Sequence, residues 1–366
     1  MTESSSQSSS QSDTVIISVN PKAGRTSPML RAEELQCCLE KKGFRVELLT
    51  DLDLVGERAN FLFADGRLRV LLGVGGDGTA AELVNRTAIG TPVSLLPAGT
   101  ANLLAKHFQL PFQPKKAAEM IESGATLTLD AGRANNRLFL VMVSAGIDAD
   151  IVSKVHQRRE ANYQKQAKKG AHISYLSYIK PIFSSILSYS YPLINVRLGF
   201  SVDMNSRLDS KEKVTDVATT FESNEEQEIN RNEMQSFPGE FQKEWGKWTF
   251  VFNLPRYGWG VTLVPHCLGN DAQLDYCFFR RAGLIASLWN VGMAQFGGLH
   301  RFLPNTRLGK ATVLQWSSES AIPFQLDGDP GGFLPVQIEV VPQRFTLVAP
   351  FKVVQKFHKS SIHSAK

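Results

Sequence analysis

The stretch LRVLLGVGGDGT at residues 68–79 joins an apolar run to a turn rich in glycine. An apolar run bounded by glycine predicts a buried strand, and residues 80–87 predict a helix after the turn. Glycine lets the backbone approach a polyphosphate, and the amides at the start of a helix point toward negative charge. The stretch therefore predicts a phosphate-binding turn between a strand and a helix.

The same alternation of strand and helix surrounds this turn. Further strands are expected at Val15–Val19, Arg45–Thr50 and Val93–Leu96, with helical patterns near residues 28–43 and 54–65. Such alternation predicts an α/β domain with a parallel sheet and helices on both faces, at residues 14–132. Ligands of these sheets gather at the carboxyl ends of the strands, where the glycine turn falls.

After about residue 130 closely spaced strand patterns replace the alternation and predict a β-rich second domain at residues 133–344. Residues 204–240 are polar and mixed in charge, so we expect a mobile insertion there, and the Ser/Gln-rich residues 1–13 predict a disordered tail. Lys180 with Pro181 and Asn290 with Gln295 interrupt the longest apolar stretches, so no membrane span is predicted.

Composition limits the partners and the compartment. A formal net charge of +5 permits anionic partners such as nucleotides or acidic lipids, and we expect no nucleic-acid partner. The four cysteines show no metal-ligand spacing with histidine, which favours a reduced, cytoplasmic chain.

Asp77 is unusual inside a phosphate turn because a carboxylate repels phosphate. Its presence predicts a bridging Mg²⁺ or a sugar hydroxyl as partner, whereas the alternative is a tight turn with Asp77 as N-cap. Gly73, Gly75 and Gly78 also satisfy GxGxxG, but they follow the third strand and no acid ends the next one, which disfavours a dinucleotide fold. The chain contains no GxxxxGK[ST] loop, so phosphoryl transfer would need other machinery.

Two further turns carry polar residues. PAGTAN at residues 97–102 opens another helix, with Thr100 as its predicted N-cap. LDGDP at residues 326–330 places two carboxylates on a turn after a strand, where one could accept a proton from a hydroxyl. Asp-Gly and Asp-Pro are also favoured turn pairs, and from this fragment alone a surface turn is the better interpretation.

Five motifs occur together in one order: Asn20-Pro21-x-x-Gly24, residues 75–79, ELVN at 82–85, PAGTAN at 97–102 and LDGD at 326–329. In this order they resemble the diacylglycerol and sphingosine kinase catalytic family, most closely its bacterial soluble lipid kinases, over about residues 14–350. The resemblance implies an α/β nucleotide domain and a β-sandwich, with ATP and Mg²⁺ in the cleft. It also implies that residues 345–358 return to the first domain.

The resemblance carries individual roles as well. It implies that Asp329 is the proton acceptor, where the family usually has Glu, with Asp77 and Asp327 as further catalytic candidates. A structural divalent ion would take the carboxylate of Asp271 and the carbonyls of Leu268 and Gln273, although Ala272 replaces the usual glycine. The implied ATP-binding positions are Asn20, Thr50, Gly75, Gly76, Asp77, Gly78, Thr79 and Thr100.

A basic stretch from Lys154 to Lys169 precedes an aromatic and apolar stretch from Tyr175 to Tyr189. This pairing suits an anionic bilayer, and a solvated helix followed by a packed helix explains it equally well. The sequence therefore predicts an ATP-dependent lipid kinase that phosphorylates diacylglycerol or a related lipid, peripheral at the inner membrane face. An NAD kinase-like enzyme and a non-catalytic nucleotide-binding protein are the alternatives.

Overall fold

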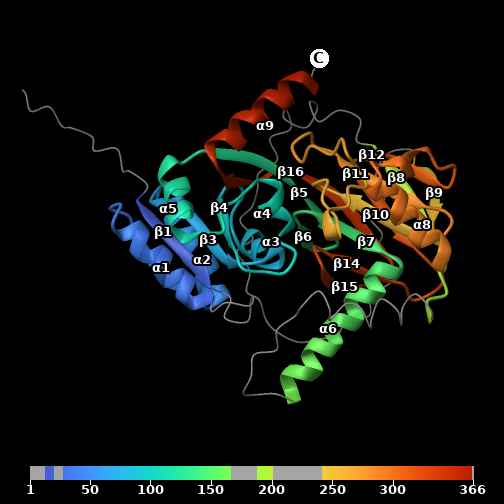
Figure 1. Ribbon diagram of the computed structural model, residues 1–366, viewed down its shortest axis with the longest axis horizontal. Helices are drawn as coiled ribbons and strands as arrows, with labels where there is room; N and C mark the ends of the chain where they lie inside the picture. Colours follow the sequence, from blue (N-terminus) through green and yellow to red (C-terminus); the bar gives the residue numbers. More distant parts are fainter. Residues whose placement is uncertain (1–12, 20–27, 166–187, 201–240, 365–366) are drawn as a thin grey trace, which may run out of the picture.

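The computed structural model describes residues 13–19, 28–165, 188–200 and 241–364 (Figure 1). The expected tail, apart from residue 13, and the expected insertion at 204–240 lie outside these ranges. So do Asn20 and most of the apolar stretch from Tyr175 to Tyr189.

The first domain is built on four parallel strands in the order β2-β1-β3-β4. The strands are β1 (Thr14–Val19), β2 (Arg45–Leu49), β3 (Leu68–Gly75) and β4 (Pro92–Pro97). The helices are α1 (Pro28–Glu40), α2 (Leu52–Ala64), α3 (Asp77–Arg86), α4 (Leu103–His107) and α5 (Pro114–Ser123). The helices pack in pairs, α1 with α5 and α2 with α3. Since the strands are parallel, the turns after β3 and β4 meet at one edge of the sheet.

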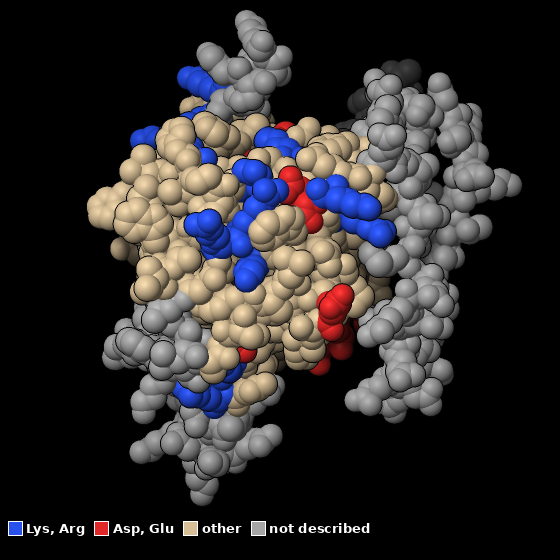
Figure 2. All heavy atoms as spheres, turned by 90° about the vertical axis from the view of Figure 1, so that its right-hand side faces the viewer, with Lys and Arg blue, Asp and Glu red and all other residues tan. Residues whose placement is uncertain are grey.

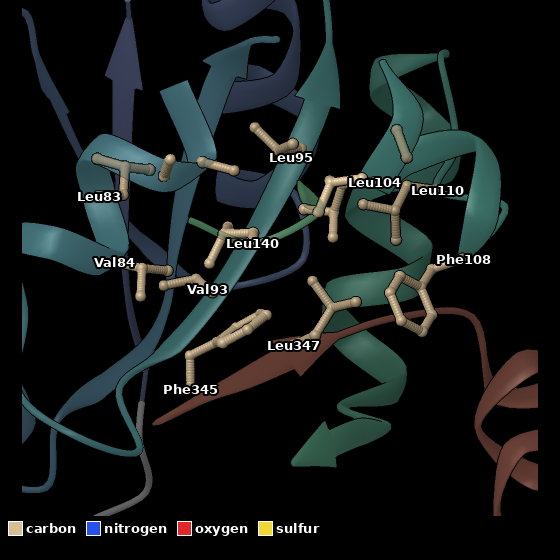
Figure 3. Close-up of a cluster of buried hydrophobic side chains, with 14 of the residues drawn as sticks. Leu83, Val84, Val93, Leu95, Leu104, Phe108, Leu110, Leu140, Phe345 and Leu347 are labelled. Carbon is tan, nitrogen blue, oxygen red and sulfur yellow. The ribbon is translucent and has the colours of Figure 1, made fainter. Parts of the chain in front are cut away.

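Strand β16 (Val336–Val348) joins the two parts of the chain. It pairs antiparallel with β5 (Thr126–Ala134), and its last residues pair parallel with β4. Phe345 and Leu347 of β16 lie in a buried cluster with side chains from α3, β4 and α4 (Figure 3). Helix α9 (Phe351–Ser364) then ends the described chain.

The second domain has two layers. Strands β8 (Ile194–Gly199), β9 (Gln242–Gly246) and β13 (Val313–Ser317) extend the sheet of β16. The other layer is a six-stranded antiparallel sheet in the order β12-β11-β10-β7-β14-β15. Its strands are β7 (Met142–Ala145), β10 (Trp248–Phe252), β11 (Leu274–Phe279), β12 (Thr306–Ala311), β14 (Pro323–Leu326) and β15 (Asp329–Phe333).

Buried side chains from both layers, among them Trp316 of β13 and Phe278 of β11, form one core. The predicted combination of a parallel α/β domain with a β-sandwich is therefore confirmed. Strand β6 (Arg137–Phe139) and helix α6 (Ile147–Lys165) flank β7, while α8 (Leu284–Gln295) and η4 (Leu299–Phe302) follow β11. None of the described helices is both long and apolar enough to cross a membrane.

Candidate active site

The two glycine turns touch at the carboxyl edge of the sheet. Gly75 at the end of β3 stands opposite Pro97 at the end of β4, and the Gly75 carbonyl accepts from the amide of Ala98 at 2.7 Å. A Cβ atom on Gly99 would lie only 2.6 Å from the Cα of Gly76. Backbone therefore packs on backbone here, and a side chain at Gly99 would separate the turns.

Asp77 holds these turns together through its buried carboxylate. Its two oxygens accept from the amides of Leu103 and Leu104, both at 2.9 Å, at the start of α4. Burial raises the pKa of Asp77, and these two amide bonds oppose that rise. The N-cap of its own helix α3 is Gly76, so Asp77 caps α4 instead.

The expectation that Thr100 is the N-cap of α4 is wrong. That helix begins after Asn102, which adopts a left-handed backbone conformation with φ of 49°. The Asn102 side chain accepts from the Gly99 amide at 3.0 Å and donates to the Gly99 carbonyl at 2.8 Å. It thus folds the turn, while the cap comes from Asp77 on another helix.

Asp329 reaches this edge from the second domain, at the start of β15. A Cβ atom on Gly78 would lie 2.7 Å from Oδ2 of Asp329, so the carboxylate rests against the glycine turn. Its side chain keeps 37% exposure, and Nη2 of Arg137 lies 3.8 Å away. Arg137 also donates to Glu82 of α3 at 3.1 Å. A partly open carboxylate thus faces the predicted phosphate-binding turn.

Asp327, two residues earlier, is bound to its own domain. Its carboxylate accepts from the amides of Leu140, Val141 and Met142 at 2.7, 2.9 and 2.9 Å. Burial raises the pKa of Asp327 to about 7, although these amide bonds act in the opposite direction. Of the two carboxylates on the turn, Asp327 anchors the hairpin and Asp329 is turned toward the glycines.

Buried polar groups that the sequence analysis missed support this hairpin. The Gly328 amide donates to Oε1 of Gln325 at 2.7 Å, and Nε2 of Gln325 donates to the Ser144 hydroxyl at 2.7 Å. Ser144 in turn donates to Asp148, which also accepts from the Trp248 indole at 2.8 Å. Gln325 and Ser144 interrupt otherwise apolar strands, which is the signal that could have identified them.

Other predicted nucleotide positions lie at or near the same edge. Thr50 is exposed at the carboxyl end of β2, and Thr79 is buried with its hydroxyl beside Gly75. Asn20 lies outside the described residues.

The predicted divalent-ion site holds a lysine instead. Nζ of Lys310 donates to the Asp271 carboxylate and lies 3.8 Å from Oδ2 of Asp275. Burial raises the pKa of Asp275 to about 6, and the Lys310 ammonium opposes this rise. In the described part of the chain, no three His, Cys, Asp or Glu side chains are arranged so that together they could hold a metal ion. Lys310 thus pairs with the carboxylate expected to bind the ion, and the roles of Asp271, Leu268 and Gln273 as ion ligands stay a prediction.

The fold and this site define a two-domain protein in which a carboxylate of the second domain faces a glycine turn of the first. Residues 14–134 match the family described as diacylglycerol kinase catalytic domain, and this match supports a kinase.

Relatives match over most of the chain. A diacylglycerol kinase of Staphylococcus aureus is 23% identical over 94% of this chain and 95% of its own length. One of Staphylococcus epidermidis is 24% identical over 85% and 84%. A solved diacylglycerol kinase structure from Bacillus anthracis shares the fold, with a TM-score of 0.60, 18% identity and coverage of 93% and 98%.

Proposed function

We propose that this protein is an ATP-dependent lipid kinase that transfers the γ-phosphoryl group to the hydroxyl of diacylglycerol or a related lipid. It would act from the cytoplasmic face of a membrane. The observation that carries the proposal is the partly exposed carboxylate of Asp329 against Gly78 of the glycine turn. The names of the relatives support diacylglycerol as the first lipid to test.

The nucleotide would bind along the edge formed by the two turns. The close contact of Gly76 with Gly99 leaves the backbone bare of side chains, as polyphosphate binding requires. The amides at the start of α3 would point at the phosphates. Mg²⁺ takes most of its ligands from phosphates and water, and when bound with ATP it would neutralise charge on the transferred group.

Asp329 would act on the acceptor. Its carboxylate would take the proton of the lipid hydroxyl as the oxygen attacks the γ-phosphorus and the bond to the β–γ bridging oxygen breaks, which releases ADP. Aspartate is one methylene shorter than the usual glutamate. The contact between Asp329 and Gly78 compensates for this, because the hairpin already lies against the turn.

The proposal is tested by incubating the full chain with labelled ATP, Mg²⁺ and separate acceptors: diacylglycerol, ceramide, sphingosine, phosphatidylglycerol and NAD. We expect label on diacylglycerol or another of these lipids, and a loss of about 10² or more with Asp329→Asn. Label on NAD alone would identify an NAD kinase. Binding of ATP without transfer to any acceptor would identify a non-catalytic nucleotide-binding protein.

A further inference from the structure

Helix α8 and the turn η4 expose an unusual number of large apolar side chains. Ile285 is 82% exposed and Phe296 is 74% exposed. We define the α8–η4 surface as Ile285, Leu288, Trp289, Phe296, Leu299 and Phe302, all of which are exposed. Large exposed apolar patches mark sites of contact with another protein or a membrane.

Helix α8 packs on the protein through one side, so its exposed apolar side chains lie on a defined outer side. Ser287, Asn290 and Ala294 are buried on the inner side of α8, and Nδ2 of Asn290 donates to the carbonyl of Arg281 at 3.3 Å. Ser287 and Asn290 therefore face inward, while Ile285, Leu288 and Trp289 face outward. This arrangement is the reverse of an ordinary surface helix, whose apolar side is buried.

The stretch of chain that forms this surface carries charges of one sign. No Asp or Glu occurs between Asp275 and Glu319, while Arg281 and Arg301 are exposed beside α8 and η4. Neither arginine forms an ion pair with another described residue, and the Arg301 guanidinium lies 4.8 Å from the centre of the Phe302 ring. The side of the molecule that carries α8 faces the viewer in Figure 2, where several Lys and Arg residues gather and fewer Asp and Glu residues lie among them.

We propose that the α8–η4 surface docks the enzyme on an anionic lipid bilayer. The inference rests on the proposed lipid kinase function and names the surface through which the enzyme reaches its substrate. Tryptophan and phenylalanine insert into the boundary between headgroups and acyl chains, and arginine binds the phosphates above them. The apolar side chains of this surface would contact the acyl chains, and its exposed guanidinium groups would contact the headgroup phosphates.

A second copy of this chain fits the surface less well. A twofold dimer would place the same patch on both sides, so Arg281 and Arg301 would meet like charges in a dehydrated interface. No acidic residue of the same stretch could balance them. An anionic bilayer supplies both negative headgroups, which can pair with Arg281 and Arg301, and an apolar layer of acyl chains.

The test uses the full chain and sedimentation with large vesicles of phosphatidylcholine containing phosphatidylglycerol. The double variant Ile285→Ser/Trp289→Ser is compared with Leu30→Ser/Ile89→Ser, which removes two similarly exposed apolar side chains from the first domain. We expect the α8 variant to lose at least about tenfold in vesicle partitioning and the control to match wild type. Both should phosphorylate a soluble short-chain diacylglycerol at the wild-type rate.

A third variant, Arg281→Gln/Arg301→Gln, should bind neutral and anionic vesicles equally. Unchanged vesicle binding by the Ile285→Ser/Trp289→Ser variant would overturn the proposal. So would the finding that the wild type is a dimer and that, among the three variants, only Ile285→Ser/Trp289→Ser dissociates it. The acceptor panel is independent of this result. Loss of vesicle binding with no lipid phosphorylated would uphold the surface and reject the kinase assignment.

Discussion

The carboxylate of Asp329 rests against the Cα of Gly78, and a single added carbon on Gly78 would lie 2.7 Å from its Oδ2 atom. The two residues belong to different domains and to motifs at opposite ends of the chain. Their contact places the proposed proton acceptor, Asp329, beside the turn that would hold the phosphates. The site therefore depends on how the domains pack, and small changes at either residue should be informative.

Gly78→Ala should lower kcat by about tenfold or more with little change in Tm. The new methyl group meets the end of a flexible side chain, which can swing aside but then leaves its position for catalysis. Gly99→Ala is the matched variant, because its methyl group would meet the Cα of Gly76. It should lower Tm and weaken ATP binding. Kinetics and thermal unfolding of both variants measure these effects. Equal losses of Tm in Gly78→Ala and Gly99→Ala would contradict the prediction.

Asp329→Asn should impair turnover, whereas Asp327→Asn should impair stability. The first should cut kcat by about 10² or more while the Kd for ATP stays nearly constant. The second should lower the free energy of unfolding by about 1–3 kcal/mol, because Asp327 accepts from three backbone amides. Turnover and denaturant unfolding separate the two effects. If Asp327→Asn is stable yet inactive, Asp327 is the proton acceptor.

Gln325→Leu should lower kcat more than it changes the KM for ATP. The substitution removes the bonds to the Gly328 amide and the Ser144 hydroxyl, which position the turn that carries Asp329. Gln315→Leu is the control, since Gln315 is equally buried but bonds only to Gln337, at 3.4 Å. A similar fall in kcat for both variants would indicate general loosening of the sandwich rather than a positioning role.

Lys310→Met should make stability depend on divalent cations. Wild-type Tm should not change with EDTA, because the ammonium already balances Asp271 and Asp275. Without it the two carboxylates repel each other, at a cost of about 1–3 kcal/mol that Ca²⁺ or Mg²⁺ should partly restore. Arg307→Met on the same strand is the control. An EDTA-sensitive wild-type Tm would show that an ion binds despite the lysine.

The contribution of His107 to stability should fall as the pH drops from about 6.5 to about 4. Burial lowers the pKa of His107 from 6.5 to about 4, so in this range the unfolded chain binds a proton that the folded chain does not. Above about pH 6.5 the histidine is neutral in both states and this contribution is fully present. His107→Gln should remove this contribution, measured as the difference between the variant and the wild type in denaturant unfolding at several pH values.

The sequence by itself determined the parallel sheet and the glycine turns at its carboxyl edge, because strand periodicity and turn chemistry act over short distances. It also placed Asp327 and Asp329 on one turn. It could not distinguish their roles, since three amides at residues 140–142 select Asp327 as the anchor.

Only the tertiary structure decided which partners the remaining polar groups find. Asp77 caps α4 rather than its own helix because the two glycine turns pack together. Lys310 reaches Asp271 because β12 pairs with β11. The sandwich buries Ser287 and Asn290 of α8 and leaves several of its large apolar side chains exposed. Each outcome depends on contacts between segments far apart in the chain, which local patterns do not encode.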